Sequence, residues 1–187
     1  MGLGNPGAQY AQTRHNAGEW FVRALAEQCK VRLTTENKYH GDIGATIIAG
    51  EKLLFLVPNT YMNRSGQAVA AVANFYKLAP QEILVAHDEL DLPPGAMKLK
   101  IGGGHGGHNG LRDIVPALGN SADFYRLRIG IGHPGAKELV TGWVLGKAPQ
   151  KEQQKMDAAI REARRYLDEL VQMDLSKVQQ ALHNIKF

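Results

Sequence analysis

The chain has a single cysteine, Cys29, among its 187 residues. One thiol cannot form an internal disulfide, which excludes a disulfide-stapled secreted scaffold and is typical of the reducing cytoplasm, where we expect this protein. Long apolar runs are also absent, since none approaches the ~18–20 residues that a membrane-spanning helix requires. The sequence has no G-x-x-x-x-G-K-[ST] motif, so we do not expect a P-loop for nucleoside triphosphates.

The chain has an ordinary globular composition, with 44% hydrophobic and 21% charged residues. A chain of this length most simply folds as one domain, residues 1–187, which is large enough for a substantial core. The net charge is +4 and the pI is about 9.2. This modest basic excess permits a polyanionic partner without requiring one.

Strand-like and helix-like segments alternate along the chain, which favours an α/β domain. The strand-like segments are apolar or alternate in polarity, and they span residues 31–35, 43–48, 53–57, 82–87, 97–101 and 124–132. Helix-like apolar stripes follow Asn16 and Ser65 and begin again at Leu111 and Gln150.

The first predicted helix has a capping-box pattern at its start. Asn16 is a good N-cap and Glu19 follows three residues later. His15 directly precedes the cap, where the positive end of the helix dipole would disfavour the imidazolium. We therefore expect His15 to be a neutral base at pH 7.

Glycine is concentrated in the Gly102–Gly110 loop, where the remaining three residues are two histidines and an asparagine. Such a cluster is costly unless the backbone needs positive φ or another group comes close. We interpret it as a strand-to-helix loop that presents imidazole and amide groups; the alternative is a flexible surface turn. The loop also matches the dinucleotide fingerprint G-x-G-x-x-G, but that motif follows a doubly buried strand, whereas this strand carries Lys98 and Lys100.

Polar side chains follow several of the predicted strands. Because function in α/β folds gathers beyond the strand ends, we expect one pocket to collect His15, His108, Asp88, Asn5, Asn63 and Asn109. A base, an acid that orients it and several neutral donors suit activation of water with hydrogen bonding of an oxyanion. The alternative is a metal site with ligands among His87, Asp88, His105 and His108. No H-E-x-x-H or similar spacing supports that alternative.

A basic surface is also predicted. Lys98 and Lys100 share one face of a predicted strand, and Arg126 and Arg128 share one face of another. If the two strands pair, the four side chains form a positive patch suited to phosphate contacts, which position a nucleic acid without reading its sequence. A solvated sheet face is the alternative.

Over nearly its whole length the chain resembles the bacterial-type peptidyl-tRNA hydrolases. Six motifs stand in that family's order: Gly2–Gly7, Thr13–Gly18, Met62–Gly66, His87–Pro93, Gly102–Gly110 and Arg128–Pro134. The resemblance implies a single three-layer α/β/α domain with a mixed, twisted β-sheet between helices, usually as a monomer. It also implies hydrolysis of the ester between a peptide and the 3′ ribose of tRNA, without a metal or another cofactor.

The resemblance further implies roles for individual residues. His15 matches the catalytic histidine, the general base, and Asp88 matches the aspartate that holds and polarises it. The groups expected to hold the peptide and the ester are Asn5, Asn63, Asn109 and His108, with Tyr10 and Met62 as pocket wall. Asn63 and Asn109 are also expected to stabilise the oxyanion. The residues expected to contact tRNA phosphates are Lys98, Lys100 and Arg128.

One departure from the family concerns the first strand. Family members usually carry several strand residues before the Gly2–Gly7 motif, whereas only Met1 precedes it here. We expect this segment to lie inside the sheet. We also expect a version extended upstream by an apolar strand to melt at a higher temperature.

Two other functions compete with peptidyl-tRNA hydrolysis. A non-catalytic RNA-binding module would keep the basic strands but would not need His15 and Asp88. A small-molecule esterase would leave the basic face without a use. The salt dependence of substrate affinity distinguishes a tRNA substrate from a small neutral ester, because phosphate contacts make the affinity for tRNA fall steeply as the salt concentration rises.

Overall fold

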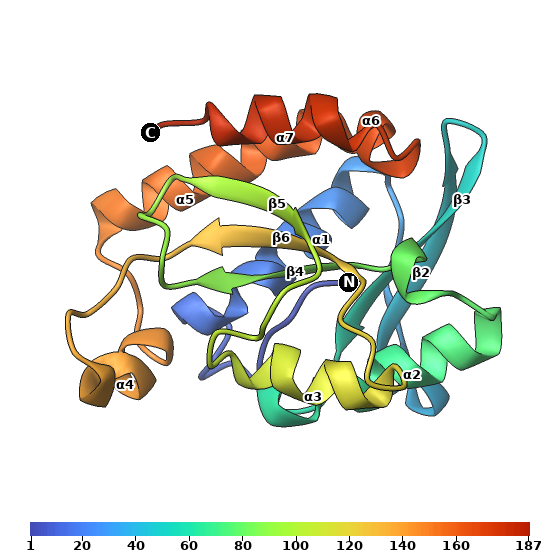
Figure 1. Cartoon of the computed structure of the whole chain (residues 1–187), viewed down its shortest axis with the longest axis horizontal. Helices are drawn as coiled ribbons and strands as arrows, with labels where there is room; N and C mark the ends of the chain where they lie inside the picture. Colours follow the sequence, from blue (N-terminus) through green and yellow to red (C-terminus); the bar gives the residue numbers. More distant parts are fainter.

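The computed structural model describes residues 1–187 and contains six strands and seven α-helices (Figure 1). The strands are β1 (Thr34–Glu36), β2 (Gly41–Ile48), β3 (Glu51–Pro58), β4 (Leu84–Glu89), β5 (Met97–Ile101) and β6 (Tyr125–Gly130). The helices are α1 (Ala17–Gln28), α2 (Ser65–Tyr76), α3 (Asn109–Ala117), α4 (Val140–Val144), α5 (Gln150–Ala163), α6 (Leu167–Val171) and α7 (Leu175–His183). Three short 3-10 turns bear on the site: η1 (Arg14–Asn16), η3 (Met62–Arg64) and η5 (Lys137–Leu139).

The strands form two three-stranded sheets that the first residues of the chain join. One sheet is antiparallel in the order β1-β2-β3, and the other is mixed in the order β4-β6-β5. Between β3 and β4, the Gly2 N–H donates to the Leu56 carbonyl oxygen at 3.0 Å and the Leu3 N–H donates to the Ala86 carbonyl oxygen at 3.1 Å. The first segment therefore lies inside the sheet, as predicted.

Helices cover both faces of this sheet, which confirms the predicted three-layer α/β/α arrangement. Helices α1, α5, α6 and α7 pack on one face, and α2 and α3 pack on the other (Figure 1). Phe21, Ile129 and Met156 are fully or almost fully buried in the first layer contact, and Ile114 and Phe124 in the second. No helix is both long and apolar enough to cross a bilayer.

Local pattern explains most element bounds but not all of them. Met97 and Leu99 face the core while Lys98 and Lys100 are exposed, so β5 has its predicted bounds. The strand predicted at residues 31–35 is shorter and displaced, because only Thr34–Glu36 pair with β2. The helical stretch predicted from Gln150 onward is divided into α5, α6 and α7.

Candidate active site

A cleft of about 860 Å³ opens at the carboxyl end of β4. Its lining includes all six residues that the strand-end argument expected to share one pocket: Asn5, His15, Asn63, Asp88, His108 and Asn109. Their spatial proximity is therefore confirmed. They come from the first loop, η1, η3, β4 and the start of α3, so the fold gathers residues from distant parts of the chain.

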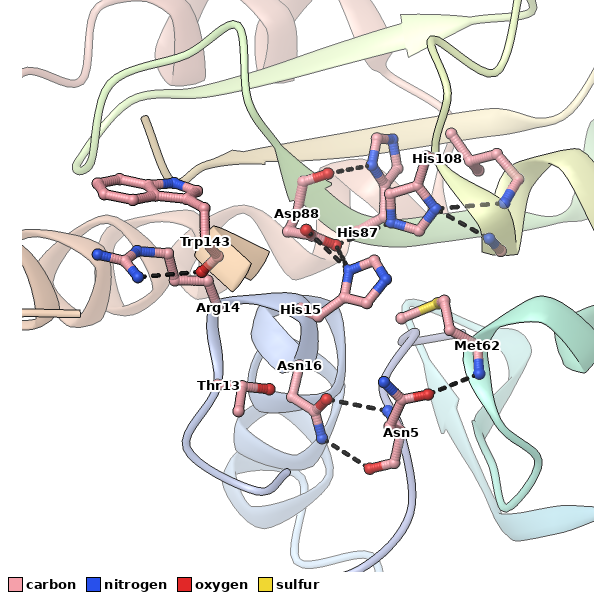
Figure 2. A network of polar contacts seen from close by, with 12 residues as sticks. Asn5, Thr13, Arg14, His15, Asn16, Met62, His87, Asp88, His108 and Trp143 are labelled. Atoms are coloured by element: carbon pink, nitrogen blue, oxygen red, sulfur yellow. Dashed lines mark hydrogen bonds and ion pairs between the residues drawn. The ribbon is translucent and has the colours of Figure 1, made fainter. Parts of the chain in front are cut away.

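Asp88 is the centre of the polar network in this cleft (Figure 2). Its side chain is buried at the end of β4. His15 Nδ1 lies 3.0 Å from Oδ1 and 2.9 Å from Oδ2 of this carboxylate, and His108 Nε2 lies 2.8 Å from Oδ1. One carboxylate therefore holds two imidazole rings, whose centroids are 5.0 Å apart.

The partners of each ring nitrogen assign the histidine tautomers. His108 is the N-cap of α3, and its Nδ1 accepts from the backbone N–H groups of Gly110 and Leu111. Its Nε2 must then carry the proton that it donates to Asp88. His15 donates to the same carboxylate through Nδ1, which leaves the Nε2 lone pair of His15 available to take a proton.

The charges of the network set its pKa values. Burial favours a neutral Asp88, but the charges and hydrogen bonds of His15 and His108 outweigh burial and hold the pKa of Asp88 well below its ordinary range. Burial likewise lowers the pKa of His15, yet the charge and hydrogen bond of Asp88 raise it above its ordinary value. The expectation that the helix dipole lowers this pKa is wrong, because a carboxylate in direct contact outweighs a partial charge.

His87 and His105 do not join Asp88 as a metal site. The His87 side chain is buried, its Nδ1 donates to the backbone carbonyl oxygen of Asp88 at 2.8 Å, and burial lowers its pKa to about 3. His105 lies in the exposed loop, where Nδ1 accepts from the Gly107 N–H. Ligand-type atoms of His15, Asp88 and His108 do lie within 4.8 Å of one another. The nitrogens nearest the carboxylate, His15 Nδ1 and His108 Nε2, are the ones that donate to Asp88, so a cation bound through them would have to displace both protons.

Asn16 holds Asn5 instead of capping α1, which corrects the predicted capping box. Asn16 Oδ1 accepts from the Asn5 N–H and Nδ2 donates to the Asn5 carbonyl oxygen, both at 2.9 Å. The predicted cap bond is absent, because the Asn16 side chain is committed to this tertiary contact. Asn5 Oδ1 in turn accepts from the Met62 N–H at 2.7 Å, which leaves Asn5 Nδ2 as a donor.

Asn109 is oriented in a similar way, since its Oδ1 accepts from Arg112 Nη1 at 3.2 Å. Its Nδ2 is therefore the free end of the amide. Asn63 and Met62 also line the cleft, whereas Tyr10 does not. The Tyr10 ring packs edge-on against Tyr61 at 6.3 Å between centroids, and Tyr61 is the residue that lines the cleft.

The basic strands pair as expected but do not form a uniform patch. In the β5–β6 register Lys98 lies opposite Arg128 and Lys100 lies opposite Arg126. Arg126 is buried and donates to the Gly104 and Gly103 carbonyl oxygens at 2.6 and 2.7 Å, so it holds the glycine loop. Arg128 donates through Nε to Glu89 at 2.7 Å. Lys98 and Lys100 are exposed, and Lys100 and Arg128 line the cleft.

Sequence reasoning missed one wall of the cleft. Residues from η5, α4 and the position after α4 line it: Lys137, Val140, Thr141, Val144 and Leu145. This stretch has neither a strand-like alternation nor a long helical stripe, so periodicity gave no signal there. By contrast, the Gly102–Gly110 loop was interpreted from its composition as part of the site, and Gly104, Gly106 and Gly107 do line the cleft.

Taken together, the cleft contains an imidazole nitrogen, Nε2 of His15, that has no partner in the protein, a buried carboxylate that fixes the ring, and the amide donors of Asn5 and Asn109, whose oxygen atoms are already bonded to the protein. Such a set can remove a proton from water and can donate hydrogen bonds to an oxyanion. It has no serine or cysteine side chain among its lining residues, so a bound water is the nucleophile that this geometry suits.

Comparison with known proteins agrees with this chemistry. The family model described as peptidyl-tRNA hydrolase matches residues 1–187. Over 186 residues the chain is 57% identical to the peptidyl-tRNA hydrolase of Shewanella baltica and 59% identical to that of Vibrio parahaemolyticus, covering 100% of this chain and 95% of each relative. The crystal structure of peptidyl-tRNA hydrolase from Acinetobacter baumannii is similar with a TM-score of 0.96 and 55% identity, covering 99% of this chain and 93% of that one. Because the family model, the relatives and the crystal structure all match this chain over essentially its full length, the chain belongs to the peptidyl-tRNA hydrolase family.

Proposed function

We propose that this protein hydrolyses the ester between the peptide and the 3′ ribose of tRNA, releasing free peptide and reusable tRNA. The observation that carries the proposal is the buried Asp88–His15 pair, with Nδ1 of His15 2.9 Å from Oδ2 of Asp88, in a chain of this family. Its substrate is produced by translation, so we place the enzyme in the cytoplasm.

In the proposed mechanism His15 Nε2 removes a proton from water, and the water oxygen attacks the ester carbonyl carbon. Asp88 keeps the His15 proton on Nδ1 and stabilises the imidazolium that forms. The amide donors of Asn63 and Asn109 stabilise the oxyanion, while Asn5 holds the peptide. When the intermediate collapses, the imidazolium returns the proton to the departing 3′ oxygen of the ribose.

We further propose that tRNA phosphates contact Lys98, Lys100 and Arg128, and that the enzyme acts as a monomer. Two features support the phosphate contacts. Lys98 and Lys100 are exposed and lie opposite Arg128 and Arg126 across the β5–β6 pair, so positive charge is concentrated there. The two arginines already bind Glu89 and loop carbonyl oxygens, which leaves the two ammonium groups as the exposed charges. Lys100 and Arg128 also border the cleft, so a bound acceptor end could reach His15.

The test is release of labelled peptide from peptidyl-tRNA in the presence of EDTA, for the wild type and for His15→Ala. We expect turnover that survives EDTA and falls ~10²–10⁴-fold in the variant, the usual contribution of one general base. Near-normal turnover by a folded His15→Ala protein would contradict the role of His15. Turnover lost to EDTA would indicate a metal site. If neither protein turned over but both bound tRNA, the RNA-binding module would be favoured.

A further inference from the structure

Helix α4 forms one wall of the cleft, and it meets the core through the partly buried side chains of Trp143 and Val144. No residue of η5 or α4 is buried, although four of them line the cleft: Lys137, Val140, Thr141 and Val144. A segment with few buried apolar contacts opens locally at a low free-energy cost. The position of this wall therefore depends on a small number of specific contacts.

Arg14, in the same turn that carries His15, makes two contacts with Trp143 of α4 and two with residues that follow α4 in the chain. Arg14 is only 4% exposed. Its guanidinium carbon lies 3.7 Å from the centroid of the Trp143 ring, and its Nη1 donates to the Trp143 carbonyl oxygen at 3.0 Å. Nη2 lies 3.6 Å from Oε2 of Glu152, and the backbone N–H donates to the Gly146 carbonyl oxygen at 3.0 Å. Figure 2 shows the Arg14 side chain beside the Trp143 ring and directed away from His15.

The chemistry of this contact favours positioning over stability. A buried guanidinium is destabilising unless it is well paired, and Arg14 Nε has no partner. What arginine offers here is a planar face, which lies over the Trp143 ring, and a fork of donors, in which Nη1 binds the Trp143 carbonyl oxygen and Nη2 faces Glu152. The Trp143 ring is fixed in turn, because its Nε1 donates to the Gly132 carbonyl oxygen at 2.9 Å.

We propose that Arg14 is a positioning residue that fastens the α4 wall to the His15 turn, so that a substrate resting on α4 is held in register with the base. The inference rests on the proposed function. Arg14 and His15 are consecutive, and their side chains bind α4 and Asp88, respectively. A displacement of α4 is therefore transmitted directly to the base, and misplacement by ~1 Å can reduce a rate by ~10²-fold.

The kinetic test uses Arg14→Lys, which keeps the charge but loses the planar fork. Arg164→Lys is the matched control, because Arg164 also donates to a backbone carbonyl and also has an unpartnered Nε, but its bond goes to Ala24 of α1 and not to the α4 wall. We expect Arg14→Lys to lower kcat/KM for peptidyl-tRNA by up to ~10²-fold, with a higher KM and a lower kcat together, and Arg164→Lys to leave both unchanged. Trp143→Leu should reproduce the rise in KM, and Arg14→Lys added to it should change KM little further.

A spectroscopic test is independent of hydrolysis. With Trp20→Phe as background, Trp143 is the only tryptophan. We expect Arg14→Lys to shift its emission to the red, because α4 moves into water. An Arg14→Lys protein that melts earlier but keeps wild-type KM, kcat and Trp143 emission would overturn the proposal, since Arg14 would then be merely structural. If the wild type released no peptide, the proposed function would fail, and the emission measurement alone would decide whether Arg14 holds α4.

Discussion

Asp88 binds two histidines that are present as different tautomers. His15 has a free Nε2, whereas both nitrogens of His108 are committed, one to Asp88 and one to the N-terminus of α3. To act as a base, His108 would have to release the backbone amides that its Nδ1 accepts. The two rings are similar in burial and lie in contact, so hydrogen-bond partners, not depth, distinguish the base from the fixed donor.

The cap made by His108 can be measured with two variants. His108→Ala and His108→Asn both lose the donor to Asp88, but asparagine is a good N-cap and alanine is not. In urea unfolding at pH 7 we therefore expect His108→Asn to be more stable than His108→Ala by about 1 kcal/mol. Equal stabilities would mean that Nδ1 of His108 does not accept from the α3 amides and is free to act as a base.

Which residues belong to this site was largely predictable from the sequence, whereas the hydrogen-bond partner of each side chain was not. Residue type and strand-end position were enough to bring Asn5, His15 and Asp88 together as candidates. The partner of a particular side chain was not predictable: Asn16 has the right spacing for a cap, yet a tertiary partner that no local pattern encodes takes its amide. The direction of the His15 pKa shift was wrong for the same reason, since Asp88 is 73 positions away in sequence.

At the scale of elements, α1 must cross β4 at very close range to bring η1 next to Asp88. Gly18 makes this possible, because a Cβ at that position would overlap the Ala86 carbonyl oxygen. The α1 backbone is also tied to the first segment of the chain, since the Glu19 N–H donates to the Leu3 carbonyl oxygen at 3.0 Å. The lack of a side chain at Gly18 is therefore a requirement of the packing between helix and sheet.

The close crossing predicts a strong effect of Gly18→Ala. We expect this substitution to lower the free energy of unfolding by about 1–3 kcal/mol, as overpacking does, and to lower activity because η1 moves with α1. Gly142→Ala is the control, since a Cβ there meets open space and alanine favours a helix by about 0.5–1 kcal/mol. Thermal and urea unfolding measure the stability of both variants. Gly18→Ala as stable as Gly142→Ala would rule out the tight crossing.

Helices and strands were predictable where the local polarity pattern agrees with the burial that the tertiary structure imposes. Met97–Ile101 alternates and is a strand with one buried face. Arg126 and Arg128 alternate in the same way, but Arg126 is covered by the glycine loop, and nothing local indicates which face of a strand another segment will cover. The division of the sheet in two was also unpredictable, because it depends on how few pairs the first segment makes with β3 and β4.

At the scale of the whole molecule, the net charge of +4 is only a modest basic excess. Binding then depends on where the charge is concentrated, and the β5–β6 pair next to the cleft is the proposed place. Charge there would bring the acceptor end to His15, and the exposed ammonium groups of Lys98 and Lys100 would be available to the phosphates, because Glu89 pairs with Arg128 and not with them.

This charge arrangement predicts the salt dependence of substrate binding. The logarithm of 1/KM for peptidyl-tRNA should fall linearly with the logarithm of salt concentration, and Lys100→Ala should reduce the slope by roughly 0.7–0.9, one phosphate contact. Lys52→Ala is the control, because Lys52 is exposed on β3 and does not line the cleft. Equal slopes for both variants would place the tRNA elsewhere, and a flat dependence for the wild type would favour the small-molecule esterase.

The central claim is that Asp88 makes His15 the base, and the pH dependence of kcat/KM tests it most directly. Activity requires neutral His15, so kcat/KM should rise with pH through the pKa of His15 and then level off. Asp88 raises that pKa while burial lowers it, so Asp88→Asn should move the rise to lower pH. The plateau should also fall by ~10²–10⁴-fold, because the tautomer is no longer fixed.

Glu89→Gln serves as the control for this profile, since Glu89 is the next carboxylate on β4 but pairs with Arg128. We expect its midpoint to stay at the wild-type pH. An Asp88→Asn profile with a lower plateau and a midpoint at lower pH is the result that this mechanism predicts. A midpoint that stays in place or moves to higher pH, or a plateau equal to that of the wild type, would contradict it.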